Sequence, residues 1–241
     1  MKNTGLDERL MACADFVRPG SVAADIGSDH AYLPIYLVKN GICPKAIASD
    51  INEGPINRAK INIAEAGLEN KICTLLADGL DKAAGLSPDD VIIAGMGGEL
   101  IRDIIDVSVY VKNNDIRLIL QPMTMSDVLR EYLYAGGYDI LDEKVCVAAG
   151  KCYQIICAHF DGISKEFDET ELTIGIPTIK KIKNGNGGET EKYYIEHTKR
   201  GAQIRLRGME SSKEPDGALI EKEKKLIILC DELMKCFKED K

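Results

Sequence analysis

Polar residues and glycines follow four apolar runs of the sequence directly, at positions that suit a ligand site. The first group is Asp25 and Gly27 in "ADIGSDHAYLP". The other three are Asp50 in "AIASDIN", Asp78-Gly79 in "LLADGL" and Gly95-Met96-Gly97-Gly98 in "IAGMGGELI". Open α/β sheets bind ligands beyond the carboxyl ends of their strands, so four such groups predict one shared site.

Each group also indicates a particular chemistry. Asp50 comes 25 residues after Asp25, where an acid at the end of a second strand can accept both hydroxyls of a ribose. Asp78 is placed to contact an adenine edge after the third strand. Taken singly, the groups could be a helix cap, a turn acid, a type I turn and a tight connection. Their occurrence after four successive runs favours the ligand site.

The first turn lacks the glycines of a dinucleotide-binding loop. Where Gly-x-Gly-x-x-Gly would cradle a diphosphate, the chain has Gly27-Ser28-Asp29-His30-Ala31-Tyr32. A diphosphate needs bare backbone N–H groups at a helix N-terminus, and the Asp29 carboxylate would repel it. A ligand with an adenosine, a cationic centre and an amino-acid tail would fit better. S-adenosylmethionine has these parts.

Predicted strands and helices, which must position these residues, alternate along the chain. Short aliphatic runs that are apolar on both faces are typical of buried parallel strands. They are Val22–Ala24, Ala46–Ala48, Ile72–Leu76, Val91–Ala94 and Leu118–Leu120, with helical stretches such as Ile56–Ala66 and Ser126–Ala135 between them. Two further strand-like runs, Tyr138–Val147 and Cys152–Phe160, surround a turn at Gly150 and predict a hairpin. The pattern predicts an open, right-handed α/β sheet that ends in an antiparallel hairpin.

Beyond residue 165 the pattern becomes helical. Apolar residues recur every seven positions in two segments, at Ile195, Ala202 and Met209 and at Leu219, Leu226 and Leu233. The segments span residues 189–209 and 217–238 and are separated by a polar turn. They predict an antiparallel helical hairpin, with two helices packed separately on the main domain as the alternative.

Composition and charge narrow the class of protein. The 241 residues carry a net charge of -8, and all of this excess lies before residue 162, since residues 162–241 hold 16 basic and 16 acidic side chains. The sequence has no apolar run of the roughly 20 residues that span a bilayer and no signal peptide at its start, which favours a cytoplasmic protein. Eight cysteines without a Cys-x-x-Cys pair are expected to be small buried residues in a reducing compartment. With three scattered histidines, no metal site is expected.

Four stretches together resemble the bacterial tRNA (adenine-22-N1)-methyltransferases, a family of class I S-adenosylmethionine-dependent methyltransferases. They are "ADIGSDHAYLP", "IAGMGGELI", "LILQP" and "GKCYQIICA", and the resemblance extends over essentially the whole chain. It implies a Rossmann-like seven-stranded sheet, parallel with a terminal antiparallel hairpin, in residues 1–162. It also implies a C-terminal α-helical coiled-coil domain in residues 163–241, as a tRNA-binding element. Methylation of N1 of adenine 22 in tRNA is the activity implied.

The resemblance also assigns roles to residues. The methionine end of S-adenosylmethionine is expected at Asp25, Gly27, Asp29 and His30, the ribose at Asp50 and Asn52, the adenine at Asp78 and Gly79, and the sulfonium at Ala94, Gly95 and Met96. Asp29, His30, Tyr32 and Gln121 are candidate catalytic residues that orient the reactants or contact the target base. The family often has Asn after "QP", where this chain has Met123. Met123 lacks the side-chain amide with which such an Asn could hydrogen-bond to the base.

Adenine N1 has a free lone pair, so no residue needs to remove a proton before methyl transfer. Binding of RNA would depend on local cations, for which the candidates are Lys180, Lys181, Lys183, Lys199, Arg200, Arg205 and Arg207. A solvated helix face explains these cations equally well. The alternatives are a methyltransferase for another RNA or a small molecule, a nicotinamide-dependent dehydrogenase, and a non-catalytic RNA-binding protein. A monomer or weak homodimer is expected.

Overall fold

The computed structural model describes residues 6–212 and 214–237 and divides the chain into two compact units. The first unit is Met1–Lys165 and the second is Glu166–Lys241. The division predicted from the sequence lay between residues 162 and 163. The functional roles expected of the two parts stay predictions.

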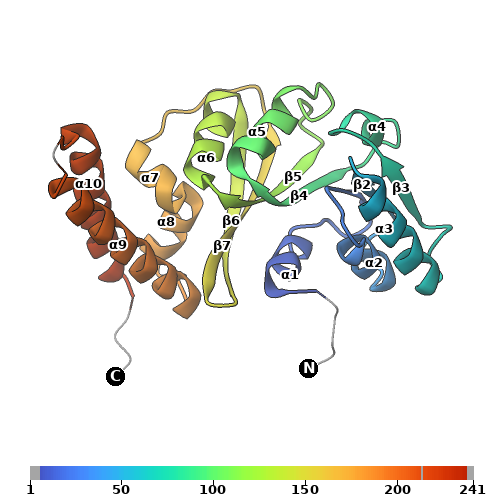
Figure 1. Cartoon of the computed structure of the whole chain (residues 1–241), viewed down its shortest axis with the longest axis horizontal. Helices are drawn as coiled ribbons and strands as arrows, with labels where there is room; N and C mark the ends of the chain where they lie inside the picture. The colour runs from blue at the N-terminus through green and yellow to red at the C-terminus, as the bar shows by residue number, and fades with distance from the viewer. Residues whose placement is uncertain (1–5, 213, 238–241) are drawn as a thin grey trace. The chain divides into compact units, whose positions relative to one another are not determined.

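A seven-stranded sheet forms the centre of the first unit, with the strand order β3-β2-β1-β4-β5-β7-β6 (Figure 1). The strands are β1 Val22–Ile26, β2 Lys45–Asp50, β3 Ile72–Leu76, β4 Asp90–Gly97, β5 Arg117–Thr124, β6 Tyr138–Ala148 and β7 Lys151–Phe160. Strands β1 to β5 pair in parallel, and β7 is antiparallel to both β5 and β6. The turn between β6 and β7 places Ala149 and Gly150 at φ values of 48° and 73°, as a tight two-residue hairpin requires. The predicted Rossmann-like sheet of seven strands with its terminal antiparallel hairpin is confirmed.

Helices cover both faces of this sheet because its strands are apolar on both sides. One face carries α1 (Glu8–Ala14), α2 (Tyr32–Lys39) and α3 (Glu53–Glu65), and the other carries α5 (Gly98–Asp106) and α6 (Ser126–Ala135) (Figure 1). The short helix α4 (Asp81–Ala84) follows β3. Side chains alternate along each strand, so Ala23, Ile92 and Ile119 point into the core beneath α1 and α2.

Four helices form the second unit. They are α7 (Glu169–Ile174), α8 (Ile176–Lys183), α9 (Glu189–Glu210) and α10 (Gly217–Met234). Ion pairs join Lys199 to Asp231 and Arg205 to Glu223, so α9 and α10 run in opposite directions. The predicted helical hairpin is therefore present, although residue 238 lies outside the described residues.

The apolar stripes of α9 and α10 are only partly buried. Ile195, Ala202, Leu226 and Leu233 are in the core, whereas Leu219 is 47% exposed. Leu219 lies in the first turn of α10 and is not part of the core between the two helices. A coiled coil in the strict sense stays a prediction.

The cysteines are less uniformly buried than the sequence suggests. Cys13, Cys43, Cys157 and Cys230 are buried, but Cys73 and Cys236 are exposed. Cys73 is exposed because it lies on the edge strand β3, next to the buried Ile72 and on the opposite face of the strand. Among the helices in the described part of the chain, none combines the length and apolar character needed to cross a membrane.

Candidate active site

A cavity of about 310 Å³ opens at the carboxyl ends of β1 and β4. These two strands are neighbours from which the chain crosses over in opposite directions, the position at which open α/β sheets bind ligands. Seven of the residues predicted for the site line this cavity. They are Asp25, Gly27, Asp29, His30, Tyr32, Ala94 and Gly95.

The turn from β1 into α2 has a fixed backbone. The N–H groups of Gly27 and Ser28 both donate to the carbonyl oxygen of Ser49 on the neighbouring strand, at 2.7 and 2.8 Å. Gly27 has φ +81°, and a Cβ added there would overlap the terminal methyl of Met96. Met96 therefore covers the turn from the end of β4, and its terminal methyl would have to shift for any larger residue at position 27.

Asp25 is the buried acid of the site. It lies on the same face of β1 as the core residue Ala23, and 8% of its surface is exposed. Burial raises the pKa of the Asp25 carboxyl to about 6, a shift that Ser28 and Arg9 oppose and that Asp50 reinforces. A carboxylate held in such a setting is a strong partner for a cation that enters the cavity, because little water competes for it.

Asp29 differs from Asp25 because its charge is already paired. Its carboxylate accepts from Arg58 and lies 3.2 Å from Nε2 of His30, with just over half of the side chain exposed. Asp29 thus lines the cavity as predicted, with its negative charge shared with Arg58. Its role toward a ligand stays a prediction, and Asp25 is the more deeply buried acid of the two.

His30 and Tyr32 form a stacked pair on the cavity wall. Their ring centroids are 5.0 Å apart and their planes differ by 10°. Asn62 on α3 donates to the carbonyl oxygen of His30 at 2.9 Å, and Ala31 between the two rings has the left-handed φ of 55°. Tyr32 is 48% exposed, so part of its side chain is accessible at the cavity wall.

The end of β4 is shaped by glycines and by Gln121. A Cβ on Gly98 would overlap the backbone of Met125, so the glycine allows α5 to begin against the end of β5. The Gln121 side-chain oxygen accepts from the Gly95 N–H at 3.0 Å. Gln121 is fully buried, so it supports the turn from behind rather than lining the cavity.

The residues expected to contact the adenosine lie outside the cavity lining. Asp50 ends β2, and its carboxylate accepts from the Asn52 N–H at 2.7 Å. Asp78 and Gly79 belong to the turn after β3, where Gly79 has φ +69°. The structure thus brings together the predicted methionine-end and sulfonium residues, and it places Asp50, Asn52, Asp78 and Gly79 at the ends of the next two strands.

Comparison with known proteins identifies the family to which this site belongs. A family model described as a methyltransferase domain matches residues 6–156. The chain is 37% identical over 187 residues to the tRNA (adenine(22)-N(1))-methyltransferase of Bacillus subtilis, covering 76% of this chain and 79% of that protein. The chain belongs to this methyltransferase family.

Solved structures agree with this assignment. The B. subtilis M1A22 tRNA methyltransferase TrmK has a TM-score of 0.76 at 30% identity, covering 95% of this chain and 98% of that one. Streptococcus pneumoniae Sp1610 in complex with S-adenosyl-L-methionine has a TM-score of 0.78 at 30% identity, covering 95% and 99%. The predictions of a methyltransferase and of S-adenosylmethionine as its cofactor are confirmed.

Arg9 also lines the cavity of this methyltransferase, and it was not predicted from the sequence. Arg9 is on α1, whose N-cap Asp7 accepts from the Leu10 N–H at 2.8 Å. The Arg9 guanidinium donates to the Gln121 side-chain oxygen at 2.8 Å. Asp7 in the position of an N-cap is the one signal in the sequence that could have indicated this helix.

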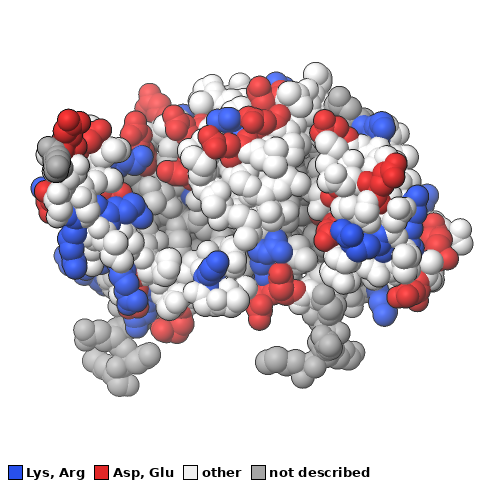
Figure 2. Space-filling model, in the orientation of Figure 1, with Lys and Arg blue, Asp and Glu red and all other residues white. Residues whose placement is uncertain are grey.

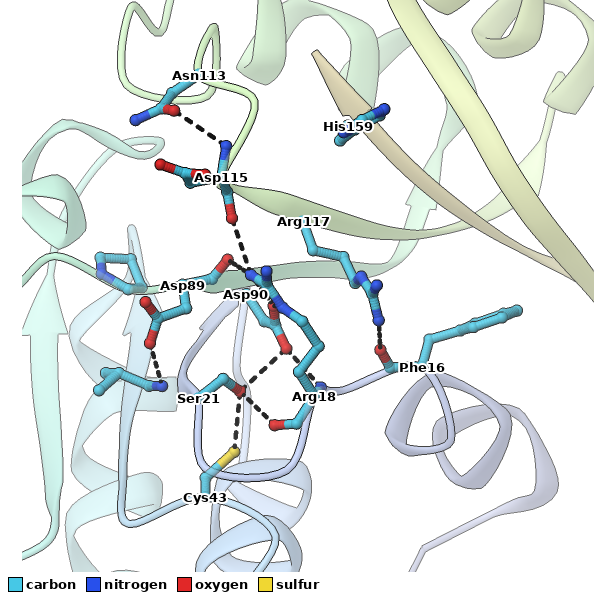
Figure 3. A network of polar contacts seen from close by, with 12 residues as sticks. Phe16, Arg18, Ser21, Cys43, Asp89, Asp90, Asn113, Asp115, Arg117 and His159 are labelled. Atoms are coloured by element: carbon cyan, nitrogen blue, oxygen red, sulfur yellow. Dashed lines mark hydrogen bonds and ion pairs between the residues drawn. The ribbon is translucent and has the colours of Figure 1, made fainter. Parts of the chain in front are cut away.

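A polar network at the opposite end of the sheet holds the segment that connects α1 to β1 (Figure 3). The fully buried Asp90, the first residue of β4, accepts from the backbone N–H and the side chain of Arg18, each at 2.7 Å, and from Ser21 at 3.0 Å. Arg117, the first residue of β5, donates to the Phe16 carbonyl oxygen at 3.1 Å. The segment is thus anchored at the amino ends of the strands, while the first turn of α1 lies at the cavity.

One group of potential metal ligands occurs among the described residues, at Asp139, His159 and Asp161. The ammonium of Lys165 lies 2.7 Å from the Asp161 carboxylate and 3.7 Å from that of Asp139. The group therefore already has a cation of the chain beside it. The expected absence of a metal stays a prediction, as does the expected oligomeric state.

Proposed function

We propose that this chain transfers a methyl group from S-adenosylmethionine to N1 of adenine 22 in tRNA. The observation that carries the proposal is the clustering of predicted residues, from Asp25 to Gly95, in one cavity of a chain that is 37% identical to the B. subtilis enzyme. A tRNA substrate places the enzyme in the cytoplasm.

The cavity residues fit the chemistry of the cofactor. S-adenosylmethionine supplies an electrophilic methyl group when bound, and it carries positive charge on its sulfonium and its ammonium. Asp25 offers a buried carboxylate for a cation, and the turn at Gly27 carries no side chain of its own and is covered by Met96. Asp50 and Asp78, at the ends of the next two strands, are the residues that would take the ribose and the adenine.

The chain's own task in methyl transfer is to orient the base, because adenine N1 needs no deprotonation. His30 and Tyr32 are the best placed for this, since their stacked rings lie on the cavity wall and Tyr32 is half exposed. A base taken out of its stack would find an aromatic partner there. Asp29 and its partner Arg58 hold this turn in position, and Gln121 holds the turn at Gly95.

The second unit offers cations for the RNA backbone. Figure 2 shows Lys and Arg side chains gathered over its helices. Of the candidates from the sequence, Lys181, Lys199 and Arg205 are paired with acids of the same unit. Lys180, Lys183, Arg200 and Arg207 are exposed and have no ion pair among the described residues. They are the cations we assign to phosphate contacts.

The test is methylation of unmodified bulk tRNA with tritium-labelled S-adenosylmethionine, followed by mapping of the labelled nucleoside. The expected product is N1-methyladenosine at position 22. A tRNA transcript that has guanosine at position 22 is the substrate control and is expected to remain unlabelled. Label in another nucleoside, or label that persists in the control transcript, would contradict the proposed substrate.

A further inference from the structure

Arg9 brings a positive charge to a cavity whose other charged residues are acids. Among the described residues that line the cavity, Arg9 is the one Lys or Arg, beside the acids Asp7, Asp25 and Asp29. The amino-acid tail of S-adenosylmethionine carries an ammonium and a carboxylate. Asp25 matches the ammonium in charge, which leaves the carboxylate without a cation unless Arg9 supplies one.

The guanidinium of Arg9 is held in place from two sides. One terminal nitrogen donates to the Gln121 side-chain oxygen at 2.8 Å, and the other lies 3.2 Å from the Asp7 carboxylate. Its side chain is 19% exposed, and one terminal nitrogen lies 3.4 Å from the position of a Cβ on Gly95. A guanidinium has five N–H donors, so the two contacts with described residues leave donors for a ligand.

The charge of Arg9 already acts on the site. Its proximity opposes the rise in the pKa of the Asp25 carboxyl that burial causes. A ligand carboxylate beside Asp25 would otherwise experience repulsion from a like charge in a setting with little water. A fixed guanidinium removes that penalty, because charge-assisted hydrogen bonds of this kind are short and strong.

The fold supplies Arg9 at a defined position. Helix α1 is fixed at its N-terminus by the Asp7 cap and beyond its C-terminus by the Arg18–Asp90 network (Figure 3). The backbone of Arg9 is therefore held beside the cavity before a ligand binds. A long side chain that becomes ordered only on binding loses conformational entropy, which lowers the affinity for the ligand.

We propose that Arg9 binds the carboxylate of the methionine tail of S-adenosylmethionine. The proposal rests on the cofactor part of the proposed function and is independent of the RNA substrate. Arg9 is thus a cofactor-recognition residue, and its contact with Gln121 links recognition of the tail to the turn at Gly95.

The test compares two ligands that differ only in the carboxylate. Isothermal titration measures the dissociation constants of S-adenosylmethionine and of decarboxylated S-adenosylmethionine for the full chain, without RNA. The wild-type protein is expected to bind the complete cofactor about 10- to 100-fold more tightly. Arg9→Gln is expected to reduce this ratio to within a few-fold of unity, mainly through weaker binding of the complete cofactor. An unchanged ratio in Arg9→Gln would overturn the proposal.

Two further variants separate recognition from folding. Arg9→Lys keeps the charge but loses the planar fork, so an intermediate ratio is expected. If Arg9→Gln does not fold, Arg9→Lys decides, and an unchanged ratio there counts against the proposal. Arg102→Gln, a change on the exposed part of α5, is the matched control and should retain the wild-type ratio. Failure of the wild-type protein to bind either ligand would instead overturn the proposed cofactor function.

Discussion

The side chain of Met96 occupies the space that a Cβ on Gly27 would need. The two residues lie at the ends of neighbouring strands, β1 and β4, and each borders the turn that we assign to the methionine end of the cofactor. Gly27 also has φ +81°, which disfavours any other residue. The backbone conformation therefore favours glycine, and the Met96 methyl would also have to shift for any larger residue.

Gly27→Ala is expected to weaken cofactor binding by at least about 10-fold, because the left-handed backbone costs roughly 1 kcal/mol and Met96 must also move. Isothermal titration with S-adenosylhomocysteine measures the effect. Gly20→Ala is the matched control, since Gly20 has a similar φ of +85° but nothing within 4 Å of its Cβ position. Adding Met96→Ala to Gly27→Ala should recover part of the affinity. Normal binding by Gly27→Ala alone would contradict this account of the turn.

The buried Asp25 carboxyl predicts a pH dependence. Its pKa is raised from 3.8 to about 6 by burial, so the folded protein binds a proton more tightly than the unfolded chain does. The free energy of unfolding of the free protein should therefore decrease as the pH rises from about 4 to about 6, and remain lower above that range. Binding of a cationic cofactor should strengthen over the same range, because it needs the ionised carboxylate.

Asp25→Asn tests this prediction by removing the charge. At pH 8 the free variant should be more stable than the wild-type protein by up to about 3 kcal/mol, a difference that shrinks below pH 5. Its cofactor affinity should be low and nearly independent of pH. Urea denaturation and titration at pH 5 and pH 8 measure both effects. A variant that is less stable than the wild-type protein at pH 8 would contradict the claim that the ionised Asp25 carboxylate destabilises the folded protein.

The main sheet could be predicted from the sequence because buried parallel strands appear as continuous aliphatic runs. The ends of these strands were less clear. The predicted runs Val91–Ala94 and Leu118–Leu120 are shorter than β4 and β5, which extend to Gly97 and Thr124. These extensions contain polar residues and glycines of the site. The apolar pattern that predicts a buried strand is therefore absent there.

The elements that were missed are short or depend on distant contacts. Helix α1 has seven residues, and α7 and α8 are separated only by Gly175, so none shows a long periodic face. Arg9 reaches the site through a contact with Gln121, 112 positions away in the sequence. No local pattern reveals such a pair. The pairing of Asp29 with Arg58 on α3 was not predicted for the same reason.

Gln121 is expected to stabilise the folded protein through its hydrogen bond to the turn at Gly95. Gln121→Leu would remove the acceptor of the Gly95 N–H and one of the two acceptors of the Arg9 guanidinium, which should lower the free energy of unfolding by about 2 kcal/mol. Gln121→Glu loses the amide donor to the Pro122 carbonyl oxygen but keeps an acceptor for both donors beside the Arg9 cation, so it should lose less stability. Urea denaturation compares the two variants. Equal losses would mean that packing at this buried position, and not the hydrogen bonds, determines the effect.

The exposed cations of the second unit should control binding of RNA but not of the cofactor. Arg200 and Arg207 are seven residues apart on one side of α9, and Lys180 and Lys183 are neighbours on α8. Replacing all four by Gln is expected to raise the KM for tRNA and to flatten its dependence on salt, because up to about four counterion-releasing contacts are lost. Affinity for S-adenosylhomocysteine should stay unchanged.

The paired cations of the same unit provide the control for this last prediction. Lys181, Lys199 and Arg205 already neutralise Glu191, Asp231 and Glu223, so less of their charge is available to a phosphate. Replacing these three by Gln should change the KM for tRNA less than replacing the four exposed cations, at a stability cost of up to about 1 kcal/mol for each pair. Measurement of KM at three salt concentrations distinguishes the variants. If both sets raise KM equally, the second unit attracts RNA through its overall field, and the assignment of phosphate contacts to the exposed cations is wrong.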